Sequence, residues 1–153
     1  TGVYSLGGFA HLPDEVRAAF GQFAGAMRGG YAAALEEVFI ARMLSAPFAA
    51  SHADVVEQVR SWLYVASGEV LASELEAVAA LPDLRPRLRD LPTKIVARAG
   101  ELDVAAPPPF SEALVQASAH ARLEIAPGCG HLLLLEDREA TTASIQRWLT
   151  AAD

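Results

Sequence analysis

Cysteine is nearly absent from this sequence, and long hydrophobic runs and an excess of basic residues are absent altogether. Cys129 is the single cysteine, so the chain cannot form an intramolecular disulfide. No run approaches the roughly 18 apolar residues of a membrane-spanning helix without a charge or a breaker. The 12 basic side chains stand against 19 acidic ones, and the net charge of −7 argues against nucleic acid and anionic membranes, which attract basic surfaces. We therefore expect a soluble, cytoplasmic protein that binds neither nucleic acid nor membrane.

The composition is that of a folded protein with much apolar surface. Apolar side chains make up 52% of the 153 residues and charged ones 20%, which excludes a disordered chain. A chain of this length can bury about 68–70% of the surface that its unfolded form exposes, enough for one sizeable core. The opening Thr1-Gly2-Val3-Tyr4 has no basic stretch before an apolar one, so it is not expected to be a signal peptide. Because it also lacks an initiating Met, we expect a processed or truncated product.

Residues 1–81 have the periodicity of helices. Apolar residues recur at intervals of three and four, and the pattern is interrupted at Gly29-Gly30, at Pro47 and at Ser67-Gly68. Four apolar stripes result: Val16, Phe20, Phe23 and Met27; Tyr31, Leu35, Val38, Phe39 and Met43; Val55, Val59, Trp62 and Leu63; Val70, Leu71, Leu75 and Val78. We predict a loop followed by a subdomain of four amphipathic helices over 1–81.

From residue 82 onward, strand patterns alternate with helix patterns. The run from Lys94 to Ala99 follows Leu91-Pro92 and ends at Gly100, which predicts a buried strand. The remaining elements that we expect are a helix over 109–118, a strand over 121–126 and a helix over 139–151. The last helix presents an apolar stripe of Ala140, Ile145, Trp148 and Leu149. This order predicts a parallel strand-helix-strand-helix unit of an α/β fold over 82–153. Two parallel strands leave open edges, so further strands must come from an upstream part or a partner.

Two candidate catalytic residues follow the two strands of this unit. Asp103 lies three residues beyond Gly100, and His131 lies five residues beyond Ala126. The carboxyl ends of neighbouring parallel strands meet at one edge of a sheet, so these side chains should lie close together. A carboxylate beside an imidazole fixes its tautomer and stabilises the imidazolium that forms when the ring takes a proton. Taken singly, Asp103 could cap a turn and His131 could be a loop histidine, but their joint spacing favours a catalytic pair.

Several motifs accompany these two residues. They are Leu91-Pro92 before a strand, Gly100-Glu101-Leu102-Asp103 with Pro107 four residues on, Gly130-His131 followed by Leu135-Glu136-Asp137, and Ile145-Gln146-Arg147-Trp148-Leu149 in the last helix. Together they resemble the C-terminal part of the alpha/beta-hydrolase superfamily. The resemblance implies a partial alpha/beta-hydrolase fold, in which the helices of 1–81 form a cap inserted after the sixth strand and Thr1 lies just beyond that strand. It also implies that Asp103 is the acid and His131 the general base of a triad whose Ser precedes both.

Ser5 is a local candidate for the nucleophile. Tyr4-Ser5-Leu6-Gly7-Gly8 resembles the Ser-x-Gly-Gly part of a nucleophile elbow. Against it, Val3 stands where a Gly is usual, only four residues precede Ser5 where a whole strand should stand, and Pro13 arrives too soon for a long helix. We therefore expect a glycine-rich loop that lines the pocket and keep Ser5 as an alternative. A further alternative, Thr1 acting through its own α-amine, would leave the Asp103 and His131 pair unexplained.

The apolar side chains of the predicted cap are candidates for a substrate pocket. The aromatic and Met residues that could contribute are Phe20, Phe23, Met27, Phe39, Met43, Phe48 and Trp62. Most are expected in the core, and we single out Trp62 and Leu132 as substrate-binding candidates. Cys129 is expected to be a packing residue, because nothing nearby in sequence supplies a base. The other histidines lack ligand spacing, so we expect neither a metal nor an organic cofactor.

The function that we predict is hydrolysis of a carboxylic ester of an apolar small molecule through an acyl-enzyme. The Ser would lie outside this chain, on the N-terminal half of the same hydrolase or on a self-associating copy, so the chain alone is expected to be inactive. The alternative is a non-catalytic ligand-binding or interaction protein that retains the pocket but has lost the nucleophile. It predicts binding of an apolar ligand without turnover.

Overall fold

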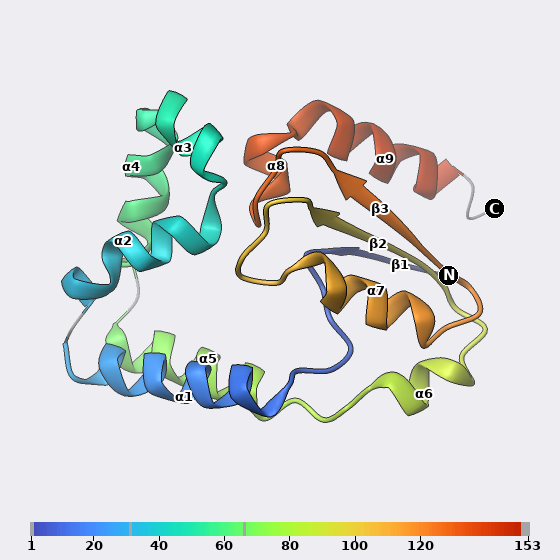
Figure 1. The fold of residues 1–153 in the computed structure, drawn as a ribbon, viewed down its shortest axis with the longest axis horizontal. Helices are drawn as coiled ribbons and strands as arrows, with labels where there is room; N and C mark the ends of the chain where they lie inside the picture. The colour runs from blue at the N-terminus through green and yellow to red at the C-terminus, as the bar shows by residue number, and fades with distance from the viewer. Residues whose placement is uncertain (1, 31, 66, 151–153) are drawn as a thin grey trace.

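The computed structural model describes residues 2–30, 32–65 and 67–150, with a parallel sheet on one side and a group of helices beside it (Figure 1). The elements in chain order are β1 (Gly2–Leu6), α1 (Asp14–Arg28), α2 (Ala32–Met43), α3 (Ala46–Ser51), α4 (Ala53–Trp62), α5 (Gly68–Ala79), α6 (Arg85–Arg89), β2 (Lys94–Gly100), α7 (Pro108–Gln116), β3 (Ala121–Ala126), α8 (Leu133–Glu136) and α9 (Arg138–Thr150). The positions of Thr1, of Tyr31 in the predicted second helix and of residue 151 in the predicted last helix lie outside the described residues.

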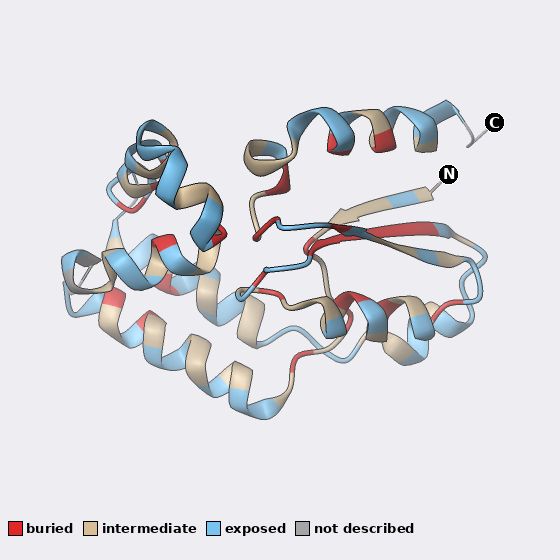
Figure 2. Ribbon diagram, turned by 45° about the horizontal axis from the view of Figure 1, so that its top comes forward, coloured by how far each residue is buried: buried red, intermediate tan, exposed pale blue. Residues whose placement is uncertain are grey.

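The sheet has three parallel strands in the order β1-β2-β3. Helix α7 covers one face, where Leu114 packs with Ile95 and Ala97 of β2, and α9 lies over the opposite face (Figure 1). Flanked on both edges, β2 is buried from Ile95 to Gly100, whereas β1 and β3 are more exposed (Figure 2). Within the described residues, β1 and β3 each have a single strand neighbour. The predicted elements of 94–151 are confirmed as β2, α7, β3 and α9.

Residues 2–6 form strand β1, so the prediction of a loop at this position is wrong. Ser5 of β1 pairs with Ala97 of β2, across the predicted boundary at residue 81, and a strand therefore precedes the cap within this chain. The segment contains little of the β-branched content that marks a strand. Tertiary contacts stabilise it instead: the Tyr4 ring meets the Trp148 ring edge-on at 5.8 Å, and Leu6 packs against the buried cluster of Ala126, Cys129 and Leu133.

The four helices predicted for 1–81 are confirmed as α1, α2, α4 and α5, and together with α3 they form the group that we call the cap. Helices α1 and α5 lie side by side around a buried cluster that includes Ala24 and Ala72 (Figure 1). Their backbones meet closely at Gly68, where a Cβ would lie 2.2 Å from the Met27 carbonyl oxygen, so only glycine fits. None of the helices in the described part of the chain has the length and apolar character needed to cross a membrane.

Three short helices, α3, α6 and α8, were not predicted, because helices of four to six residues are too short for a periodic pattern. Helix α3 shows how one sequence signal was misinterpreted. The sequence predicts that the second helix ends at Pro47, but Pro47 lies in the first turn of α3, where a proline is favourable. The Ser45 side chain caps that turn by accepting a hydrogen bond from the Phe48 amide at 3.4 Å.

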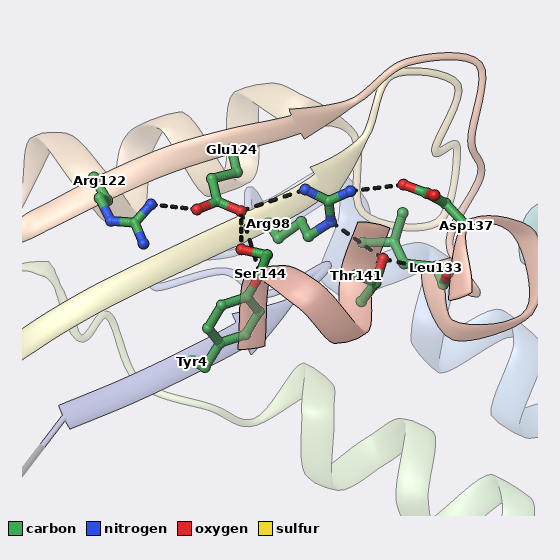
Figure 3. Close-up of polar contacts among 8 residues, drawn as sticks. All are labelled: Tyr4, Arg98, Arg122, Glu124, Leu133, Asp137, Thr141 and Ser144. Atoms are coloured by element: carbon green, nitrogen blue, oxygen red, sulfur yellow. Dashed lines mark hydrogen bonds and ion pairs between the residues drawn. The ribbon is translucent and has the colours of Figure 1, made fainter. Parts of the chain in front are cut away.

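A buried polar network joins the sheet to α9 (Figure 3). The Arg98 side chain, 8% exposed, donates to Asp137 at 2.7 Å, to Glu124 at 3.3 Å and to the Thr141 hydroxyl at 3.2 Å. Glu124 in turn accepts hydrogen bonds from the Ser144 hydroxyl and from Tyr4 of β1. All three strands are therefore connected to this network.

The network explains which face of α9 points inward. The sequence predicted an apolar stripe, yet Thr141 and Ser144 are the buried residues of α9, while Ala140 and Leu149 are exposed. A buried guanidinium needs polar partners, because an unpaired charge in the interior is costly. The inward face of α9 therefore combines Thr141 and Ser144 with the partly buried Ile145 and Trp148 of the predicted stripe.

We predict that Arg98→Ala destabilises the fold strongly. The substitution leaves the Glu124 and Asp137 carboxylates without their buried partner, so the free energy of unfolding should fall by about 3–5 kcal/mol. Urea unfolding followed by circular dichroism measures this change. Arg87→Ala, at an exposed position without an ion pair in the described residues, is the matched control and should have little effect. Equal stability of the two variants would contradict the role given to Arg98.

The Glu124 carboxyl should contribute a pH-dependent part of the stability. Burial by itself raises the pKa of Glu124, but hydrogen bonds from Ser144 and Arg122 outweigh it and hold the pKa below its ordinary value of 4.5. Its stabilisation is therefore complete above the ordinary pKa and is lost as the pH falls through the folded-state pKa. The free energy of unfolding, measured from about pH 6 to about pH 3, should depend less on pH in Glu124→Gln than in the wild type. Glu112→Gln, at an exposed position of α7, should keep the wild-type profile.

Candidate functional site

The loops that follow β2 and β3 are in direct backbone contact. The Leu102 amide donates to the Cys129 carbonyl oxygen at 2.8 Å, and the Glu101 amide donates to the Ala126 carbonyl oxygen at 3.0 Å. At Gly100 a Cβ would lie 2.1 Å from the Gly130 carbonyl oxygen, so no larger residue fits between the loops. This contact brings the two loops together at the carboxyl ends of the strands, where open α/β sheets place their sites.

Asp103 and His131 extend from these two loops toward each other. Nδ1 of His131 lies 2.8 Å from Oδ2 of Asp103, whose side chain is fully buried, whereas the His131 side chain is 27% exposed. Oδ1 of Asp103 accepts hydrogen bonds from the Ala105 and Ala106 amides, both at 2.8 Å. These bonds fix the carboxylate, which favours the tautomer with the proton on Nδ1. Nε2 of His131 is then free to accept a proton.

Gly7, at the end of β1, packs against the side chains of His131 and Asp103. Its φ of +58° is readily adopted only by glycine, and a Cβ at Gly7 would lie 2.8 Å from Cε1 and 2.9 Å from Nδ1 of the His131 ring. Its amide donates to the Arg98 carbonyl oxygen at 2.9 Å, which ties the end of β1 to β2. The sequence singled out Gly7-Gly8 only as part of a loop lining the pocket. Gly7 does line the cavity, and it also packs against the candidate base.

A cavity of about 420 Å³ is lined by residues of both this site and the cap. Its lining consists of Leu6, Gly7, Phe9, Val16, Ala19, Phe20, Phe23, Met27, Phe39, Arg42, Met43, Leu63, Leu71, Glu74, Leu75, Val78, Ala105, Ala106 and His131. The lining is mainly apolar, and the volume falls in the usual range for small-molecule pockets. His131 is the residue of the candidate pair that reaches this cavity.

Five of the seven apolar cap residues considered as pocket candidates line the cavity. The two residues singled out for substrate binding, Trp62 and Leu132, do not. Trp62 lies at the end of α4 and is 38% exposed, whereas its neighbour Leu63 lines the cavity. Leu132 packs against the cluster around Ile40 and Leu44, while the preceding His131 faces the cavity. Neither Trp62 nor Leu132 lines this cavity, because adjacent residues in a helix or turn point in different directions.

Ser5 is not brought to His131. It lies within β1, and its hydroxyl occupies the space beside Gly8, where a Cβ would be 1.9 Å from the Ser5 Oγ. Within the described residues no hydrogen bond joins Ser5 to His131, and Ser5 does not line the cavity. This geometry gives no support to Ser5 as the nucleophile.

Cys129 lies close to the pair but has the environment of a packing residue. Burial, and then the negative charges of Asp137 and Glu136, raise the pKa of the Cys129 thiol above its ordinary value. A thiol with a raised pKa is a poor nucleophile at neutral pH. Among the described residues, no group of three or more His, Cys, Asp and Glu side chains is arranged to hold a metal ion.

Comparisons with known proteins show similarity in sequence and in fold. Residues 3–144 match the sequence model of the alpha/beta hydrolase family. A thermophilic esterase from Thermogutta terrifontis, in a malate-bound structure, aligns at a TM-score of 0.80 and 25% identity, over 92% of this chain and 52% of its own. The enol-lactonase from Burkholderia xenovorans aligns at 0.85 and 26% identity, over 97% of this chain and 55% of its own. No curated protein sequence matches the chain significantly.

The fold likeness extends to more distant structures. An alpha/beta hydrolase enzyme from a Medee basin deep-sea metagenome library aligns at a TM-score of 0.86 and 18% identity, over 98% of this chain and 56% of its own. The chain therefore spans about half the length of the solved structures that it matches.

We predict that an apolar fluorescent probe such as anilinonaphthalene sulfonate binds in the cavity. Ala19 lines the cavity, whereas the adjacent Ala18 is exposed and does not line it. Ala19→Trp should fill part of the cavity and raise the Kd of the probe by about tenfold, or about 1.4 kcal/mol, while Ala18→Trp should leave it unchanged. Fluorescence titration measures both. Equal effects of the two substitutions would place the probe elsewhere.

Proposed function

Because the chain belongs to the alpha/beta hydrolase family, we propose that Asp103 and His131 are the acid and the general base of a Ser-His-Asp hydrolase. The observation that carries the proposal is the 2.8 Å contact between His131 Nδ1 and the fully buried Asp103 carboxylate. The ring reaches an apolar cavity large enough for a small molecule. The reaction that we propose is hydrolysis of a carboxylic ester of an apolar small molecule.

Each residue has a defined part in this reaction. A Ser hydroxyl attacks the ester carbonyl while Nε2 of His131 takes its proton, and Asp103 stabilises the resulting imidazolium through Nδ1. His131 then gives the proton to the leaving alcohol as the carbon-oxygen bond breaks, which leaves an acyl-enzyme. Water, deprotonated by His131, attacks the acyl-enzyme and releases the acid and the free Ser hydroxyl. The apolar cavity keeps bulk water from the charged intermediate.

The choice of an ester rests on the relatives and on the lining of the cavity. An esterase and an enol-lactonase are among the similar structures, which supports an ester or lactone as the reacting group. Arg42 and Glu74 are the charged side chains that share the lining with His131, and the rest is mainly apolar. An apolar substrate body is therefore the better fit.

We place the nucleophile outside this chain. Within the described residues no Ser hydroxyl hydrogen-bonds to His131, and the chain spans about half the length of the matching structures. The edge of β1 away from β2 has no strand neighbour in the described residues. Further strands, with the Ser and the oxyanion hole, would join at this edge from the N-terminal half of the same hydrolase or from another copy.

The test is active-site labelling with a fluorophosphonate, applied to this chain alone and to the polypeptide that includes the proposed N-terminal half. The label should appear on a Ser outside residues 1–153, and the isolated chain should remain unlabelled. In the longer polypeptide, assayed without the label, His131→Ala should lower kcat for ester hydrolysis by about 10⁶-fold, and Asp103→Asn by about 10⁴-fold. Peptide mapping by mass spectrometry and steady-state kinetics measure these outcomes.

His120→Ala is the matched control, because His120 is an exposed histidine that does not line the cavity. It should retain wild-type activity. A label on Ser5 would make the chain self-sufficient and would refute an external nucleophile. Absence of any label, with apolar ligand binding retained, would favour the non-catalytic binding protein instead.

A further inference from the structure

The loop that carries His131 is connected directly to the cap by one carboxylate. Oε1 of Glu136 accepts a hydrogen bond from the Ser45 amide at 3.1 Å, and Oε2 accepts one from the Gly130 amide at 2.9 Å. Ser45 lies between α2 and α3 of the cap, and Gly130 immediately precedes His131. Figure 1 shows α8, which ends at Glu136, beside the turn between α2 and α3.

Two further contacts join the same segments. The Leu132 amide donates to the Met43 carbonyl oxygen at the end of α2, at 3.1 Å. At Gly130 a Cβ would lie 2.5 Å from the Ser45 amide nitrogen and 2.9 Å from the Leu44 carbonyl carbon. The cap therefore rests on the backbone of the His131 loop itself, on both sides of the catalytic candidate.

The chemistry of the contact requires a carboxylate. An ionised carboxylate is acceptor-only, so its two oxygens can each take one amide proton in a charge-assisted bond. No other acceptor in the described residues bonds to the Ser45 or Gly130 amides. A Gln at position 136 would offer one oxygen, and its NH2 group would face the second amide donor. Unpaired backbone amides at buried positions are unfavourable, so the contact should then separate.

We propose that Glu136 is a positioning residue that couples the seating of the cap to the orientation of His131. The same cap segment reaches the cavity through Met43 and the His131 loop through Ser45. When the cap is seated, Glu136 holds Gly130 in place and His131 meets Asp103; when it lifts, the loop loses that support. The catalytic meaning of this coupling rests on the proposed function, but the coupling itself is measurable without activity.

The experiment is NMR of the chain with and without Glu136→Gln. In the wild type, the proton shared by His131 Nδ1 and Asp103 should give a low-field signal, and the Ser45 and Gly130 amides should exchange slowly with solvent. In Glu136→Gln both amides should exchange at least about tenfold faster, and the low-field signal should broaden or vanish. Glu139→Gln, at an exposed position of α9 without a side-chain hydrogen bond in the described residues, is the matched control and should change neither.

A second variant tests the coupling without removing the carboxylate. Gly130→Ala places a Cβ against Ser45 and Leu44, and Gly130 has no positive φ that would strain an alanine. It should weaken the His131 signal as Glu136→Gln does, whereas Gly21→Ala, which meets open space, should not. Faster exchange with an unchanged His131 signal in either folded variant would reduce Glu136 to a structural contact and overturn the proposal. If Glu136→Gln does not fold, Gly130→Ala decides. Neither result alters the labelling test of the proposed function.

Discussion

The close approach of two backbone segments, at Gly100 and Gly130, is the constraint on which the candidate site depends. A Cβ at Gly100 would meet the Gly130 carbonyl, and a Cβ at Gly130 would meet the Ser45 amide of the cap. The sheet, the His131 loop and the cap thus meet through close backbone contacts at these two glycines. This contact lets the short Asp103 side chain reach the imidazole from a neighbouring loop. Hydrogen bonds from the Ala105 and Ala106 amides then fix the Asp103 carboxylate beside His131.

The carboxylates of Glu136 and Asp137, which are adjacent in sequence, both stabilise the loop that carries His131. Glu136 bonds to the cap at Ser45, and the next residue, Asp137, pairs with the buried Arg98 in the middle of the sheet. The turn after His131 is therefore held from two directions by residues that are consecutive in sequence. Because Arg98 is on β2, the strand that leads to Asp103, both members of the candidate pair are connected to the same rigid element.

The accuracy of the sequence predictions varied with the range of the interactions involved. The longer helices and the strands β2 and β3 carry their signals within a single segment, and they were predicted correctly, whereas the short helices α3, α6 and α8 were not. Strand β1 was missed because its stability comes from β2 and Trp148, far along the chain. The burial of Thr141 in α9 was missed because its partner Arg98 lies on another element. Trp62 and Leu132 lie outside the lining of the cavity, because periodicity identifies an apolar face without saying what that face meets.

By itself, the sequence determined the element types of most of the chain, the α/β class and the pairing of Asp103 with His131, because periodicity, strand composition and motif spacing are local properties. Only the tertiary structure decided the third strand, the residues that line the cavity and the bridge from Glu136 to the cap. Each of these depends on the direction of a side chain or backbone group toward a segment distant in sequence. That direction is set by the packing of the whole chain, which a local sequence pattern does not reveal.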